Sequence, residues 1–323
     1  MANPVLAEVV RGGLVESAHR GAVAATGQDG AVRYTLGDAH SAMYARSSNK
    51  PLQALGILHA GLEIDEADLA LACASHSGQP EHAARALALL HRHGLTEHDL
   101  ACPADYPLHE PTKLDAVRSG GGERRVSMNC SGKHAAMLAT CVQRGWPTQG
   151  YTDPKHPLQQ AIATSVVELT GEPIAATTVD GCGAPLFAFS LAGLARAFSL
   201  LGNATSGRRY QVAEAMRAHP WLVAGSGQED TLLMLGVPGL LAKRGAEAVH
   251  ALALPDGSAL AIKVDDGAKR ALGPIVVAAL RAHGVRGSSP AAEAVLDGLA
   301  EGEVLGGGEP VGTLRVPAGL FAG

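Results

Sequence analysis

The chain contains a single Ser-x-x-Lys sequence, formed by Ser47 and Lys50 in the segment Arg46-Ser47-Ser48-Asn49-Lys50-Pro51. In a helical turn, residues three positions apart project to the same side, so a neutral lysine can take the proton of the serine hydroxyl. The ordinary pKa of lysine is about 10.4, so this role requires burial or a neighbouring cation. Pro51 has no N–H to donate, which places the serine at a helix entrance or in a tight turn. The pair predicts nucleophilic attack on a carbonyl; the alternative is a serine-rich turn with a solvated lysine.

A second group of hydroxyls follows the apolar segment Leu69–Cys73, in Ala74-Ser75-His76-Ser77-Gly78. A strand or helix that ends in a polar turn closed by glycine can hold a serine at a site. The alternative is a helix cap followed by a loop. The adjacent serine and histidine are not by themselves a Ser-His-Asp triad, because triads are assembled in space from distant segments.

Two further tight turns each place a cysteine near glycine, in Asn129-Cys130-Ser131-Gly132-Lys133-His134 and in Asp180-Gly181-Cys182-Gly183-Ala184-Pro185. Two thiolates and one nitrogen ligand suit zinc and leave a position for water. The spacing is not the Cys-x-x-Cys of structural zinc sites, so buried free thiols are the alternative. No Gly-x-x-x-x-Gly-Lys-Ser/Thr loop is present, which disfavours a nucleotide-binding role.

A late lysine stands in Lys263-Val264-Asp265-Asp266-Gly267, at the end of an expected strand. If it faced the first lysine, like-charge repulsion would lower the pKa of that amine. The alternative is an ordinary strand followed by an Asp-Asp-Gly turn.

The elements that must position these residues divide the chain into three parts. Strands are expected near both ends, and the middle, from about Pro51 to Leu201, has alanine and leucine at helical spacing, as in the helix expected from Pro80. Asp256-Gly257 predicts a hairpin turn between two of the late strands. The expected strands are 5–10, 21–25, 31–34, 249–254, 259–264 and 312–316, and the expected helices include 80–91 and 210–218. This order predicts an α+β fold, with an antiparallel sheet built from both chain ends and an inserted helical subdomain. We expect residues 1–45 and 205–323 to form the sheet domain and residues 46–204 the helical subdomain, with the active site at their junction.

The composition excludes several classes of protein. The 323 residues carry a formal charge of −5 and are 46% hydrophobic but only 3% aromatic. An acidic, aromatic-poor chain lacks the basic footprint and stacking side chains of a nucleic-acid binder. The five cysteines cannot all pair internally, which favours a reduced compartment. With no signal-peptide pattern and no apolar run of about 20 residues, we expect a soluble cytoplasmic protein without membrane partners.

Several of these motifs together resemble the asparaginase II family. They occur in the family's order and cover nearly the whole chain: Glu16–Gly21, Arg46–Ala54, Ala74–Gly78, Asn129–His134, Asp180–Pro185, Lys243–Glu247 and Lys263–Gly267. The resemblance implies a serine-dependent, zinc-containing L-asparaginase with a fold similar to glutaminases and serine β-lactamases. The Thr-Gly-Gly-Thr segment of the threonine-dependent asparaginases is absent.

The resemblance also implies a role for individual residues. Ser47, as nucleophile, would pair with Lys50, and Ser75 with Lys263; Ser75 is preferred to Ser77 because it precedes His76 as in the family. The remaining roles would be a Zn²⁺ ion held by Cys130, Lys133, Cys182 and a water, and a substrate pocket containing Arg46, His134 and Asp180. The family further implies a homodimer acting on the small molecule L-asparagine.

The expected reaction is hydrolysis of the side-chain amide of L-asparagine through an acyl-enzyme on Ser47. Three alternatives remain open. The acyl-enzyme chemistry could serve glutamine, another amide or a β-lactam; a zinc-bound hydroxide could be the attacking species; or the protein could bind an amino acid without catalysis.

Overall fold

The computed structural model describes residues 2–321, which form two compact units. One, the sheet unit, comprises residues 2–48, 190–202 and 232–321 of the described chain; the other, the helical unit, comprises residues 49–189 and 203–231. This division differs from the one expected from the sequence in residues 46–48 and 190–202, which belong to the sheet unit, and in residues 205–231, which belong to the helical unit. Helix α10 (Glu229–Gly236) crosses the last boundary.

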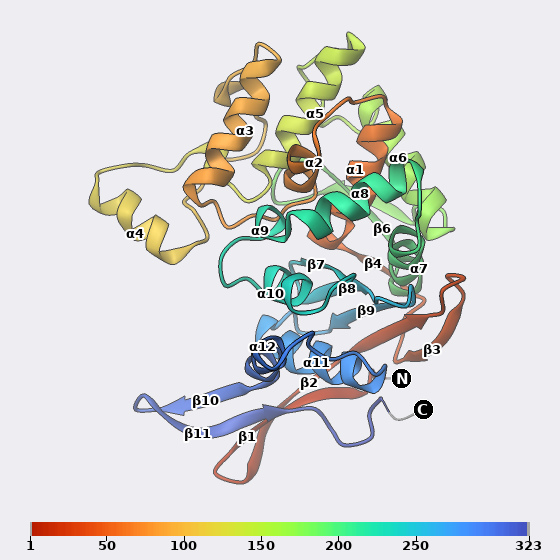
Figure 1. Cartoon of the computed structure of the whole chain (residues 1–323), viewed down its shortest axis with the longest axis vertical. Coiled ribbons are helices and arrows are strands. Elements are labelled where there is room, and N and C mark those ends of the chain that lie inside the picture. The colour runs from red at the N-terminus through yellow and green to blue at the C-terminus, as the bar shows by residue number, and fades with distance from the viewer. Residues whose placement is uncertain (1, 322–323) are drawn as a thin grey trace. The chain divides into compact units, whose positions relative to one another are not determined.

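The sheet unit is built around an antiparallel sheet formed by both ends of the chain, as Figure 1 shows. The strand order is β10-β11-β1-β2-β9-β8-β7, and β3 pairs with β2. Within the described residues the strands of this sheet are β1 (Val5–Arg11), β2 (Leu14–Thr26), β3 (Val32–Leu36), β7 (Leu241–Gly245), β8 (Val249–Ala253), β9 (Ala259–Val264), β10 (Gly302–Gly306) and β11 (Glu309–Arg315). The predicted hairpin at Asp256-Gly257 joins β8 to β9, with Ala253 opposite Ala259. The predicted α+β class and the antiparallel sheet from both chain ends are confirmed.

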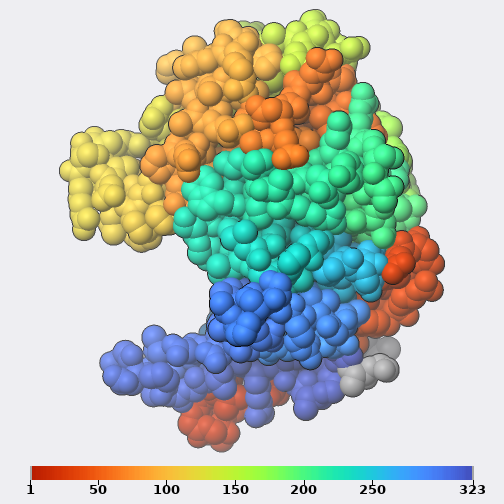
Figure 2. Space-filling model, in the orientation of Figure 1, coloured from red at the N-terminus to blue at the C-terminus, as the bar shows by residue number. Residues whose placement is uncertain are grey.

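Helices cover this sheet. Strand β8 is buried along its whole length and β9 nearly so, which requires packing on both faces. Helix α7 (Leu191–Gly202) packs on β2, β8 and β9, while α11 (Leu272–Ala282) packs on α12 (Pro290–Ala300) and β1. The short strand β4 (Ala42–Tyr44) leads towards the Ser47 turn, and the β10–β11 hairpin extends from the rest of this unit, as the space-filling view shows (Figure 2).

The helical unit is organised around α1 (Lys50–His59), which is buried from Lys50 to Leu58. It packs closely on α6, where the Gly56 position faces the backbone of Ile162. The other elements of this unit are α2 (Glu66–Ala72), α3 (Pro80–Arg92), α4 (Glu110–Arg118), α5 (Ser131–Arg144), α6 (Pro157–Thr170), β5 (Ala176–Val179), β6 (Pro185–Ser190), α8 (Gly207–Ala218) and α9 (Pro220–Val223). The predicted helix beginning at Pro80 is confirmed and ends at Arg92.

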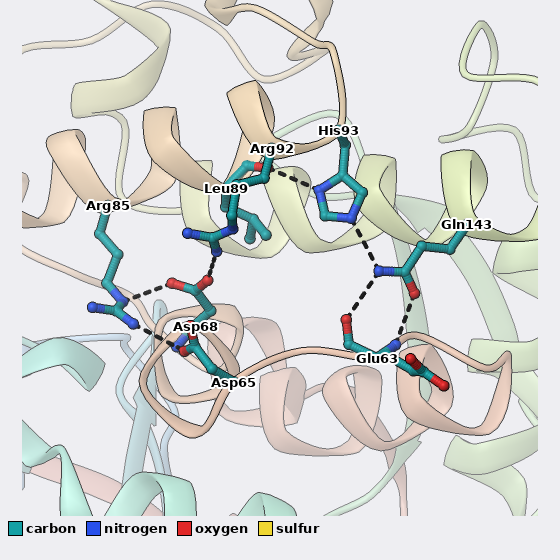
Figure 3. A network of polar contacts seen from close by, with 8 residues as sticks. All are labelled: Glu63, Asp65, Asp68, Arg85, Leu89, Arg92, His93 and Gln143. Carbon is teal, nitrogen blue, oxygen red and sulfur yellow. Dashed lines mark hydrogen bonds and ion pairs between the residues drawn. The ribbon is translucent and has the colours of Figure 1, made fainter.

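A buried carboxylate joins α2 to α3 (Figure 3). Asp68 is fully buried, and its two oxygens form ion pairs with Arg85, at 2.6 Å from Nε, and with Arg92. Asp65 caps α2 by accepting the Asp68 N–H at 2.7 Å, and it also pairs with Arg85. The side chain of Asp68 therefore fixes how two helices of the site-bearing unit pack.

We expect Asp68→Asn to lower the free energy of unfolding by about 2 kcal/mol, because it removes the charge that two arginines face. The loss is smaller than the 3–5 kcal/mol typical of a fully buried pair, because the arginine side chains are 33% and 50% exposed and can turn to water. Urea unfolding measures the change. Asp115→Asn is the control, because it breaks only an exposed pair with Arg118 and should change stability by less than about 0.5 kcal/mol. Equal effects of the two substitutions would contradict the structural role of Asp68.

A second buried group on α3 is His82. Its ring lies between His76 and Trp221, with centroid distances of 4.9 and 4.1 Å and nearly parallel planes. Its Nε2 lies 3.1 Å from the Trp221 carbonyl, which can only accept, so Nε2 carries the proton. Burial lowers the pKa of His82 to about 4.

The low pKa of His82 makes stability depend on pH. Between its ordinary value of 6.5 and about 4 the unfolded state binds a proton that the folded state does not, so stability falls as the pH falls through this range, by about 3 kcal/mol in total. His82→Gln keeps a donor for the Trp221 carbonyl but does not titrate. We expect the stability advantage of the unmodified protein over this variant to shrink by about 2 kcal/mol between pH 7.5 and 4.5 in urea unfolding. His98→Gln, at an exposed position, should show no such change, and a pH-independent difference for His82→Gln would contradict the prediction.

Candidate active site

Lys50 is almost fully buried, at 1% exposure, at the first position of α1. Its Nζ contacts the Ala74 carbonyl, the Ser75 hydroxyl at 2.8 Å and the Asn129 carbonyl at 3.4 Å. A neutral amine has two N–H groups and one lone pair. Two carbonyls can therefore accept both N–H groups while the lone pair faces a hydroxyl, so this arrangement allows Lys50 to take a proton from Ser75.

The two candidates for the second serine have different partners. Ser75 contacts Lys50, whereas the hydroxyl of Ser77 donates to the side-chain oxygen of Gln79 at 2.9 Å. The Ser75 N–H is itself held by the Val223 carbonyl at 3.0 Å. Within the helical unit the geometry thus favours Ser75 as the hydroxyl that exchanges a proton with a lysine.

The loop that carries Ser75 is fixed by a distant segment around α9. The Gln79 side chain accepts the Ser226 N–H at 2.8 Å and donates to the Ser226 hydroxyl at 3.1 Å, to which the Trp221 indole also donates at 2.9 Å. Gly225, at φ +116°, approaches Ser77 so closely that an added Cβ would lie 2.0 Å from the serine oxygen. We name this arrangement of Gln79, Trp221, Gly225 and Ser226 the loop clasp. Gln79 and Ser226 are 147 residues apart, so no local sequence pattern predicts this contact.

A cluster of sulfur and nitrogen atoms lies at the start of α5. The Lys133 Nζ is 3.2 Å from the Cys182 sulfur, and both side chains are buried. A side-chain hydrogen bond between Cys130 and Cys182, together with Lys133, lowers the pKa of Cys182 despite burial. The same hydrogen bond and burial raise the pKa of Cys130, whose sulfur also lies 3.0 Å from the Asn129 side-chain oxygen. Burial alone would lower the pKa of Lys133, but the charges of Cys182, Cys130 and Asp180 raise it. These directions favour a thiolate at Cys182, a thiol at Cys130 and an ammonium ion at Lys133.

A chain of hydrogen bonds orients His134 beside this cluster. Tyr151 accepts the Ala101 N–H at 2.9 Å, and its hydroxyl lies 2.6 Å from His134 Nδ1, to which it can donate. The buried His134 Nε2 then carries the proton, has no nitrogen or oxygen partner within residues 2–321, and interacts with the Cys182 sulfur. Burial lowers the pKa of His134, which favours the neutral ring. No sequence motif marks Tyr151.

In the sheet unit, the backbone around Ser47 is strained. Arg46 has φ +51°, a left-handed conformation that is unfavourable for a residue other than glycine. It begins the 3₁₀ turn Arg46–Asn49, which runs directly into α1. Gly245 at the end of β7 lies against this turn, and an added Cβ would be 3.1 Å from the Ser47 nitrogen and 2.6 Å from the Ala45 carbonyl oxygen. The Ser47 hydroxyl has no hydrogen-bond partner in the described part of the chain.

The same unit contains Lys263 near the end of β9. Its Nζ donates to the carbonyls of Glu247 and Val264 at 2.8 and 2.5 Å. Burial lowers the pKa of Lys263, although nearby carboxylates oppose this effect. The Glu247 carboxylate also lies 3.9 Å from the Arg46 guanidinium. Glu247, for which no role was predicted, therefore contacts two predicted site residues, Arg46 and Lys263.

The predicted residues thus form two groups, one in each unit. The helical unit brings Lys50 together with Ser75. It also brings Cys182 together with three residues of the other cysteine motif, Cys130, Lys133 and His134. Asp180 belongs to the tight turn that holds Cys182, in which the Gly183 N–H donates to the Asp180 carbonyl at 2.8 Å. The sheet unit contains Arg46, Ser47 and Lys263. The pairing of Ser47 with Lys50 and of Ser75 with Lys263 remains a prediction.

Comparisons with known proteins add the family. Residues 7–316 match the family model described as L-asparaginase II. A search of curated protein sequences gave no significant match. The solved structures that are similar include a β-lactamase from Mycobacterium bovis, at 17% identity and a TM-score of 0.44 over 81% of this chain and 94% of that one. They also include a putative β-lactamase from Bacteroides dorei, at 14% identity and a TM-score of 0.41 over 80% and 92% of the two chains.

No helix in residues 2–321 combines the length and the apolar character that crossing a bilayer requires.

The family assignment rests on the match over residues 7–316, which covers nearly the whole sequence and all of the site segments described above. The chain therefore belongs to the L-asparaginase II family.

Proposed function

We propose that the protein hydrolyses the side-chain amide of L-asparagine to L-aspartate and ammonia through an acyl-enzyme on Ser47. The observation that carries the proposal is the contact between the buried Lys50 amine and the Ser75 hydroxyl at 2.8 Å, in a chain of the L-asparaginase II family. A buried amine held by carbonyls next to a hydroxyl is suited to proton transfer and has no evident use in a binding protein.

The proposed first step is acylation. Lys50, directly or through Ser75, takes the proton of the Ser47 hydroxyl, and the Ser47 oxygen attacks the side-chain carbonyl carbon of asparagine. The proton returns to the amide nitrogen, the C–N bond breaks and ammonia leaves, so the substrate remains as an aspartyl ester of Ser47. Water then attacks this ester, gives its proton to the same base and releases L-aspartate, which restores the serine.

The strained turn supports Ser47 as nucleophile. The left-handed Arg46 and the absent N–H of Pro51 leave the serine at a helix entrance, where main-chain N–H groups are not all used by the helix. The position of Gly245 against the Ser47 nitrogen leaves no room for a side chain there. A main-chain N–H at this place can donate to the oxyanion of the tetrahedral intermediate.

The remaining predicted residues are proposed to assist proton transfer and to bind the substrate. Lys263, whose pKa burial lowers, would exchange a proton with Ser75, while Arg46, His134 and Asp180 would bind the charged and polar groups of asparagine. Arg46 suits a carboxylate and Asp180 an ammonium group, which are the two α-substituents of the substrate.

We also propose that Cys130, Lys133 and Cys182 hold a zinc ion. No three His, Cys, Asp or Glu side chains form a metal-binding group in the described chain, so such a site depends on the lysine nitrogen. The donors fit in type and number, because two sulfurs and one nitrogen converge at the start of α5, and binding of the ion would displace the proton of Lys133. When bound, the ion would supply positive charge that stabilises both thiolates and the neutral amine of Lys133.

We expect Ser47→Ala to lower the rate of ammonia release from L-asparagine by at least about 1,000-fold, because the acyl-enzyme cannot form. Mass spectrometry of quenched reactions should show the aspartyl ester on the unmodified protein and not on the variant. Ser48→Ala is the matched control, because the Ser48 hydroxyl is bonded to the Ala45 carbonyl at 2.6 Å; we expect a loss of less than about 10-fold. Full turnover by Ser47→Ala would refute the mechanism, and glutamine in a parallel assay tests the substrate.

Protein purified without chelator should contain about one zinc ion per chain by elemental analysis, and Cys182→Ala should contain almost none. Cys141→Ala is the control: burial raises the pKa of Cys141 to about 11, and this inert thiol on α5 takes no part in the cluster. It should retain the metal. Zinc-free unmodified protein, or undiminished zinc in Cys182→Ala, would contradict the proposed ligands.

A further inference from the structure

A second candidate binding site lies within the helical unit, away from the Lys50–Ser75 contact. A cavity of about 490 Å³ is formed where α8 packs against α1 and α2, a size typical of small-molecule pockets. Its floor is aliphatic, with Leu58, Leu62 and Leu69 almost fully buried. The charged residues of its lining are Glu63, Glu66, Arg208 and Glu214.

The charged residues of this cavity are of two kinds. Glu66 pairs with His219 at 3.1 Å and Glu214 with Arg217 at 2.7 Å. The Glu63 carboxylate and the Arg208 guanidinium, in contrast, have no hydrogen-bond or ion-pair partner within residues 2–321. The cavity therefore combines one unpaired anion, one unpaired cation and an aliphatic floor.

The position of Glu63 is fixed although its carboxylate is unpaired. Figure 3 shows Gln143 of α5 holding the main chain of Glu63, with the Glu63 N–H donating to Gln143 at 2.8 Å and Gln143 donating to the Glu63 carbonyl at 2.9 Å. The carboxylate makes no contact in that network. The main chain at this position is thus already fixed, so a ligand that binds the carboxylate has only the side chain to order.

We propose that this cavity binds a zwitterionic α-amino acid with an aliphatic side chain. Arg208 binds the α-carboxylate, for which a guanidinium offers two parallel donors, and Glu63 accepts the α-ammonium. The aliphatic side chain packs on Leu58, Leu62 and Leu69. Lys50 and Leu58 are eight residues apart on α1, about 12 Å along the helix, so the cavity is distinct from the Lys50–Ser75 contact. The proposal does not depend on hydrolysis of asparagine.

The same features disfavour other small molecules. A dicarboxylic acid would bring a second negative charge to a rim with three glutamates. An amino acid with a polar side chain would place that group against the leucine side chains of the cavity, where it would have no hydrogen-bond partner. A simple amine would leave Arg208 unpaired.

Isothermal titration calorimetry of the protein with L-leucine tests the proposal. 4-Methylpentanoate lacks the ammonium group and 3-methylbutylamine lacks the carboxylate. Each should bind about 10-fold or more weakly than leucine, because one charged hydrogen-bonding group is lost. Equal affinity for leucine and either analogue would overturn the zwitterion assignment.

Variants locate the binding site. Arg208→Gln and Glu63→Gln change exposed side chains and should each weaken leucine binding about 10-fold or more. Arg209→Gln is the matched control: this neighbouring arginine pairs with Glu168 and does not line the cavity, so leucine affinity should be unchanged. Leucine binding that is absent from the unmodified protein, or unaffected by Arg208→Gln and Glu63→Gln, would refute the proposal. Neither result bears on ammonia release from asparagine.

Discussion

The burial of the Lys50 amine is the constraint on which the helical unit depends. A lysine amine inside a protein is costly to bury unless its N–H groups are hydrogen-bonded. Lys50 stands at the first position of α1 with 1% exposure. Its partners come from two other segments, the loop after α2 and the turn before α5. These segments must converge on Lys50 for its N–H groups to find hydrogen-bond partners. The hydrogen-bonding requirement of one buried amine thus brings the Ser75 loop into place.

The same requirement explains why the loop after α2 needs external support. A loop can hold a hydroxyl within hydrogen-bond distance of an amine only when its main chain is fixed. The loop clasp supplies this support through the Gln79 side chain, which bonds to both the N–H and the hydroxyl of Ser226, while the Val223 carbonyl accepts the Ser75 N–H. The stack of His76, His82 and Trp221 joins the clasp to α3. Residues remote from the candidate reaction thus set the position of Ser75.

Local patterns predicted the elements better than their contacts. The chain-end strands, the Pro80 helix and the Asp256-Gly257 hairpin follow from turn residues and periodicity, which are local properties. The first half of β2 was not predicted, because its residues are mostly exposed and polar and show no buried alternation. The motifs identified Lys50 and Ser75, but no rule of spacing could show that they contact each other across 25 positions. Tyr151 and the loop clasp were missed for the same reason: their roles exist only in the tertiary structure.

The pair formed by Lys133 and Cys182 is difficult to explain as a device for stability. Removing two opposite charges from water costs about as much as their attraction returns, and apolar side chains of similar size often pack as well. Here the thiolate also receives a hydrogen bond from the Cys130 thiol and interacts with a histidine that Tyr151 orients. Each of these groups favours negative charge on one sulfur. This polar support for one thiolate is what the proposed zinc site rests on, since sulfur and amine donors suit zinc better than magnesium or calcium.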